Sequence, residues 1–143
     1  MKKIAIFFLI VIIVIAGVSY LYLNWKANWK VAQRQNRQFE SYLEQEIYGS
    51  ELATILNKAM DNNQKNEIPK DNKGNYIDDG NHCLKIEIYM LDNEETYPME
   101  TLFRGGMDKF VQYYNAIKFK CVTIKHHKTT NKVSYMRFEQ ITN

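Results

Sequence analysis

The residues best suited to metal binding or nucleophilic chemistry are two cysteines and three histidines: His82, Cys83, Cys121, His126 and His127. Structural zinc sites normally take their ligands in closely spaced pairs, and the sequence shows no pair of cysteines or of histidines at such a spacing. The adjacent His126 and His127 point to opposite faces of an extended strand, so at most one of them could join a shared site. The sequence therefore predicts no metal site and no cofactor.

Catalysis by a thiol is the main enzymatic alternative. Cys121 could act as a nucleophile beside a histidine, but it lies in an apolar stretch that predicts a strand, where thiols are usually inert. The sequence contains no G-x-S-x-G motif, no P-loop and no dinucleotide-binding glycine pattern. We expect a non-enzymatic protein, and a membrane-anchored enzyme that uses Cys121 and a histidine is the alternative.

The two cysteines also allow a structural interpretation. If the domain is exported to an oxidising compartment, Cys83 and Cys121 could form one disulfide. Two cysteines make a weak pattern, however, and free cysteines are often small buried hydrophobic residues. We favour burial, and the disulfide stays open as the alternative.

All of these residues follow an apolar run from Ile4 to Leu23 that contains no charged side chain. As a helix, the run is about 30 Å long, which matches the hydrocarbon core of a bilayer. A cleaved signal peptide is the alternative, because Lys2 and Lys3 form a basic leader and small residues occur near the end of the run. The run is longer than the roughly 7–15 apolar residues of a cleavable signal, so we predict a retained anchor over residues 1–23.

Aromatic residues stand where the interfacial belt of a membrane helix belongs: Tyr20, Tyr22, Trp25 and Trp29. Basic residues give opposing indications of orientation. Lys2 and Lys3 favour a cytoplasmic N-terminus. A cytoplasmic C-terminal domain is favoured instead by the basic residues that follow the run: Lys26, Lys30, Arg34 and Arg37. Because a short basic leader before an apolar run is typical of an export signal-anchor, we predict a single-pass protein of the cell membrane with its C-terminal domain outside the cytoplasm.

Residues 24–48 are predicted to continue the helix beyond the membrane. Neither proline nor glycine interrupts them. One face of this amphipathic extension repeats at spacings of three and four: Trp25, Trp29, Ala32, Asn36, Phe39, Leu43 and Ile47. Such a helix needs a partner surface, either this chain's own sheet or a neighbouring copy.

Residues 49–143 are predicted to form one small domain with an α+β fold. Gly49 ends the preceding helix, and Ser50 caps a short helix that ends near residue 62. Strands are predicted at 83–90, 118–125 and 132–138, and a helical segment before the last two is divided at residues 105 and 106. The first strand alternates between apolar and polar residues, which favours a small antiparallel sheet with one buried face.

Positive charge is concentrated in the final hairpin: Lys118, Lys120, Lys125, Lys128, Lys132 and Arg137. These residues could bind an anionic polymer or lipid headgroups, although such charge is more often the solvated face of a sheet. Of the 19 basic residues, 17 follow the apolar run, and they nearly balance the 16 acidic residues. This balance gives no indication of nucleic acid as a partner.

The order of a basic leader, an apolar helix, an amphipathic extension and a small antiparallel sheet resembles a type IV pilin or pseudopilin. Pilin leaders end in Gly followed by Phe or Met, with Glu inside the apolar helix. Here Lys3 runs directly into Ile4, and no acidic residue interrupts the run. The chain is also similar to small membrane-anchored proteins of Gram-positive bacteria, which implies no activity.

From these features we expect a membrane-anchored, non-enzymatic binding or assembly protein, pilin-like or an accessory of a surface or secretion complex. Its expected partners are the membrane and either other copies of itself or a membrane or surface complex. A tethered binder of anionic polymer or lipid through the basic hairpin is a further alternative.

Overall fold

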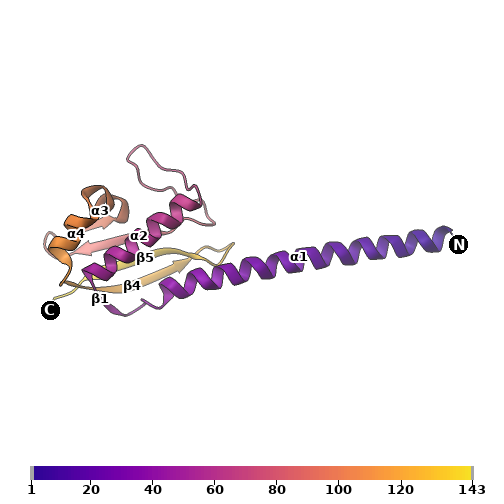
Figure 1. Ribbon diagram of the computed structural model, residues 1–143, viewed down its shortest axis with the longest axis horizontal. Helices are drawn as coiled ribbons and strands as arrows, with labels where there is room; N and C mark the ends of the chain where they lie inside the picture. Colours follow the sequence, from indigo (N-terminus) through magenta and orange to yellow (C-terminus); the bar gives the residue numbers. More distant parts are fainter. Residues whose placement is uncertain (1, 143) are drawn as a thin grey trace.

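Residues 2–142 of the chain are described by a computed structural model, which has the expected α+β fold. A long N-terminal helix leads into a small domain with one five-stranded sheet and short helices (Figure 1). In chain order the elements are α1 (Lys2–Glu40), β1 (Glu46–Tyr48), α2 (Gly49–Lys65), β2 (Lys85–Met90), β3 (Glu95–Pro98), α3 (Met99–Gly105), α4 (Met107–Tyr114), β4 (Lys118–His126) and β5 (Val133–Gln140).

The sheet has the strand order β1-β4-β5-β2-β3. Neighbouring strands are antiparallel except β2 and β5, which run parallel, so the sheet is mixed and not antiparallel throughout. The β2–β3 and β4–β5 pairs are local hairpins, and α3 and α4 carry the chain between them. This helical crossover brings β5 beside β2 in the same direction, which is the kind of connection that a parallel pair requires.

Helix α1 ends at Glu40, before the predicted end at residue 48. Glu44 then adopts a left-handed conformation with a φ of 60°, and its N–H donates to the Cys121 carbonyl oxygen at 2.9 Å. The following residues form β1 on the edge of β4, where Ile47 is buried opposite Phe119. The edge of β4 offers unpaired backbone groups, and pairing with them prevails over the helical spacing of the side chains.

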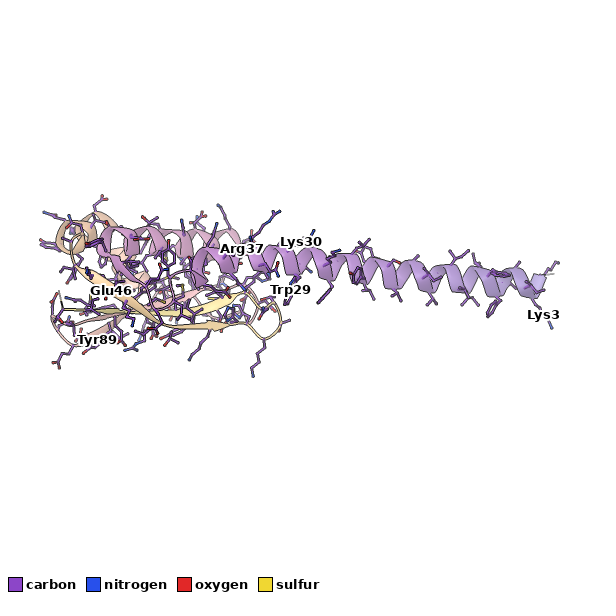
Figure 2. The ribbon with its side chains drawn as sticks, turned by 90° about the horizontal axis from the view of Figure 1, so that it is seen from below. Lys3, Trp29, Lys30, Arg37, Glu46 and Tyr89 are labelled. Atoms are coloured by element: carbon purple, nitrogen blue, oxygen red, sulfur yellow. The ribbon has the colours of Figure 1, made fainter. Side chains whose placement is uncertain are left out.

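The hydrophobic core lies between one face of the sheet and the helices of the domain. Helix α2 buries the stripe predicted for it: Leu52, Ile55, Leu56, Ala59 and Met60. The strand predicted at 83–90 begins at Lys85, and the residues predicted to face inward are buried: Leu84, Ile86, Ile88 and Met90. Cys83, which the alternation placed on the polar face, precedes the strand and is buried as well. Figure 2 shows Tyr89 on the side of the sheet away from the helices, so this second face is open.

Helix α2 begins at Gly49, and its N-cap residue is Tyr48, not the predicted Ser50. The Gly49 N–H donates to the Ile117 carbonyl oxygen at 2.9 Å, so α2 starts directly against the end of α4. A Cβ at this position would lie 2.0 Å from the Tyr114 carbonyl oxygen. Glycine is therefore required here for the close approach of two backbones, and not as a stop signal for α1.

A fully buried polar side chain joins α2 to the sheet. Asn63 donates from Nδ2 to the Leu84 carbonyl oxygen at 2.7 Å and accepts the Leu84 N–H at Oδ1 at 2.8 Å. The amide therefore acts as a neighbouring strand would, and it satisfies both backbone groups of the residue that precedes β2.

Candidate functional site

Both cysteines are free and buried. Strand β5 lies between β4, which carries Cys121, and β2, which follows Cys83. Two strand spacings are about 10 Å, whereas a disulfide needs Cα atoms within about 7 Å, so the structure does not bring these residues together. Burial raises the pKa of Cys83 to about 12 and the pKa of Cys121 to about 11, so both remain thiols at neutral pH.

His126, the last residue of β4, and His127, which follows it, are held in structural contacts. His126 Nε2 lies 2.7 Å from Glu40 Oε1, which links the strand to the end of α1. His127 is buried, and its Nε2 lies 2.7 Å from a backbone carbonyl oxygen of the segment before β2. The Cys121 Sγ faces the Thr123 carbonyl oxygen at 3.9 Å and not an imidazole. Within residues 2–142, Cys121 is therefore not paired with a histidine in the way that an activated thiol requires.

One cluster of titratable groups was not predicted from the sequence. The ligand atoms of Asp78, Asp79 and His127 lie within 4.8 Å of one another. Partial burial raises the pKa of Asp79, but three N–H donors from residues 81–83 lower it more strongly, so this pKa lies well below its usual value. Asp78 accepts the Gly80 N–H at 2.8 Å. Both carboxylates thus have a structural role in closing their own loop.

The basic residues of the final hairpin do not form one continuous surface. Three of them form ion pairs on the open face of the sheet: Lys118 with Glu46 at 3.3 Å, Lys120 with Glu44 at 2.6 Å and Arg137 with Glu139 at 2.9 Å. Lys125 lies over the ring of Tyr135, 5.1 Å from its centroid. Lys128 and Lys132 lie apart from these residues, at the β4–β5 turn. The predicted patch is thus divided into a largely neutralised sheet face and a separate pair of lysines.

The two turn lysines line a groove of about 590 Å³ between α1 and the β4–β5 turn. Its α1 wall contains Trp25, Asn28, Trp29 and Val31, and its other wall contains residues 128–132 and His82. The rings of the two tryptophans stack with centroids 6.0 Å apart. Figure 2 shows Trp29 where α1 leaves the domain. No acidic residue of the described chain lines this groove.

Asn36 fixes the β4–β5 turn to α1. Its Nδ2 donates to the Asn131 carbonyl oxygen at 2.7 Å, and its Oδ1 accepts the Val133 N–H at 2.9 Å. One turn earlier, Ala32 is buried, and its small side chain lets the hairpin approach the helix closely. The two walls of the groove are therefore joined by direct contacts and keep their relative position.

No protein-family model, curated protein or solved structure matches this chain. Its function has to be inferred from its own residues, beginning with α1. This helix contains an 18-residue window with a mean hydropathy of 3.0, none of which is buried, and it is long and apolar enough to cross a membrane. The residues predicted for the membrane interface are exposed along the same helix: Tyr20, Tyr22, Trp25 and Trp29.

Proposed function

We propose that this chain is a single-pass membrane protein that acts by binding or assembly, with its α+β domain outside the cytoplasm. The observation that supports this most is the exposure of the apolar part of α1. In water this large apolar surface would be left uncovered. A bilayer covers residues 4–23 over about 30 Å. The same helix packs against the sheet from Ala32 onward, so the domain is held close to the membrane surface.

The proposed orientation is supported by the short basic leader, Lys2 and Lys3, directly before the apolar run. The basic residues after the run favour the opposite orientation, with the domain in the cytoplasm. One of them, Lys26, places its ammonium group 5.9 Å from the centroid of the Tyr22 ring, at the end of the apolar run. We infer that such residues serve the helix at the lipid headgroups and do not set its orientation.

A binding or assembly role is supported by the surfaces of the chain. The open face of the sheet presents paired charges together with tyrosines, a composition that suits contact with another protein surface. The apolar part of α1 offers a second surface, through which copies of this chain could associate in the membrane, as in the pilins it resembles. A membrane or surface complex is the alternative partner.

Thiol labelling of the folded full-length protein separates this function from that of an anchored enzyme. The variant Cys83→Ala isolates Cys121, and Cys121→Ala isolates Cys83. Because burial raises the pKa of each thiol by about two units or more, we expect alkylation at neutral pH to be roughly 100-fold slower than for an exposed cysteine. The alkylation rates should rise as the pH approaches 11. As the control, unfolding the protein in denaturant should restore rapid labelling. Rapid labelling of Cys121 in the folded protein at neutral pH would favour the enzyme.

A further inference from the structure

We propose that the groove between α1 and the β4–β5 turn binds the headgroup of an anionic phospholipid in the leaflet from which α1 emerges. This inference rests on the proposed membrane anchoring and adds a ligand to it. Three observations support it: the position of the groove along α1, its aromatic wall, and its two lysines, which form no ion pair within residues 2–142.

The groove begins at the depth of the lipid headgroups. If residues 4–23 span the hydrocarbon core, Trp25 lies about 3 Å and Val31 about 12 Å beyond the edge of that core. The polar layer on each side of a bilayer is about 5–8 Å thick. The α1 wall therefore begins among the headgroups, and it faces Lys128 and Lys132 of the β4–β5 turn, which Asn36 holds about 20 Å beyond the edge of the core.

Lys128 and Lys132 give the groove a positive charge that the protein leaves unpaired. Within residues 2–142, no ion pair includes either ammonium group. Lys132 is half-buried, and burial lowers its pKa, although the charge of Asp79 opposes this. A partly desolvated cation without a carboxylate partner is stabilised by an anion that enters the groove.

The remaining groups of the groove suit a phosphate attached to a lipid. The Asn28 amide and the Thr129 hydroxyl can donate hydrogen bonds to phosphate oxygens. Trp25 and Trp29 are 61% and 42% exposed, and tryptophan prefers the boundary between acyl chains and headgroups. A choline headgroup would add a cation beside the two lysines, so a headgroup with a net negative charge, such as phosphatidylglycerol, is the preferred ligand.

Tryptophan fluorescence tests this proposal because the chain's two tryptophans both line the groove. The full-length protein is reconstituted into phosphatidylcholine vesicles that contain a small, equal fraction of nitroxide-labelled phosphatidylglycerol or nitroxide-labelled phosphatidylcholine. We expect the labelled anionic lipid to quench the tryptophans more strongly than the labelled neutral lipid. In the variant Lys128→Gln/Lys132→Gln, the affinity for the anionic lipid relative to the neutral lipid should fall about thirtyfold. This fall corresponds to about fivefold for each lysine.

The matched control is Lys58→Gln/Lys109→Gln, which removes the same charge from exposed positions on α2 and α4. It should keep the preference. Equal quenching by both lipids, or equal losses in the two double variants, would overturn the proposal. Inorganic phosphate should displace the labelled lipid no better than chloride at the same ionic strength; specific displacement by phosphate would instead show a general phosphate site.

The same vesicles distinguish failure of this inference from failure of the proposed anchoring. After an alkaline wash, the chain should float with neutral and anionic vesicles alike, because its insertion depends on α1 and not on the groove. Flotation without a headgroup preference would reject only the lipid site. Release from both kinds of vesicle would reject the anchoring and the lipid site together.

Discussion

Gly49→Ala is expected to lower the free energy of unfolding of the domain by about 3 kcal/mol or more. The added Cβ would lie 2.0 Å from the Tyr114 carbonyl oxygen and 2.7 Å from the Tyr114 carbonyl carbon. Both are backbone atoms, so no side-chain rotation relieves the clash. The hydrogen bond from the Gly49 N–H to the Ile117 carbonyl oxygen would have to lengthen as α2 moves away from α4.

Urea unfolding of the full-length protein in detergent measures this loss when it is followed by pulsed labelling of Cys83 and Cys121, which are buried in the domain. Gly105→Ala is the matched control, because no atom lies within 4 Å of its added Cβ and its φ is not positive. We expect this control to change stability by about 1 kcal/mol or less. Equal stabilities of the two variants would show that α2 and α4 do not approach each other as closely as described.

Asn63→Leu is expected to lower the free energy of unfolding by about 2–6 kcal/mol. Leucine has a similar volume but leaves the N–H and the carbonyl oxygen of Leu84 without the partners that Asn63 supplies at 2.8 and 2.7 Å. Each buried polar group that loses its partner costs about 1–3 kcal/mol. The same urea titration measures the effect.

Asn57→Leu makes the same chemical change at an exposed position of the same helix, and we expect it to alter stability by about 0.5 kcal/mol or less. Asn63→Asp should destabilise the domain at least as much as Asn63→Leu near neutral pH, because a fully buried carboxylate would lose its hydration and face the Leu84 carbonyl oxygen. If Asn63→Leu proved as stable as Asn57→Leu, the amide would not be the link between α2 and β2.

The elements with strong periodicity were predictable from the sequence. The apolar run, the stripe of α2 and the alternating strand before Met90 all adopt the predicted conformation. Two strands were not predicted, because their pairing partners decide their structure. Residues 46–48 continue a helical pattern but pair with the edge of β4, and residues 95–98, for which no strand was predicted, pair with β2. In both cases tertiary hydrogen bonds prevail over local preference.

The groove could not have been predicted, because its walls are about a hundred positions apart in the chain. Trp29 was expected at the membrane interface and Lys132 in a basic hairpin, but their proximity depends on where that hairpin docks. Asn36 fixes this docking, and the sequence places it in the apolar stripe without indicating its hydrogen bonds. A polar residue within an apolar stripe is a signal that could have suggested a buried contact of this kind.

Protease treatment of intact, wall-stripped cells that carry a C-terminal tag on this protein tests the central claim most directly. We predict that the tag is removed while a cytoplasmic marker protein stays intact, and that a fragment containing α1 remains in the membrane after an alkaline wash. The exposed apolar helix and its basic leader are the basis of this prediction. A tag that stays protected until the membrane is opened would contradict the orientation, and with it the proposed function outside the cytoplasm.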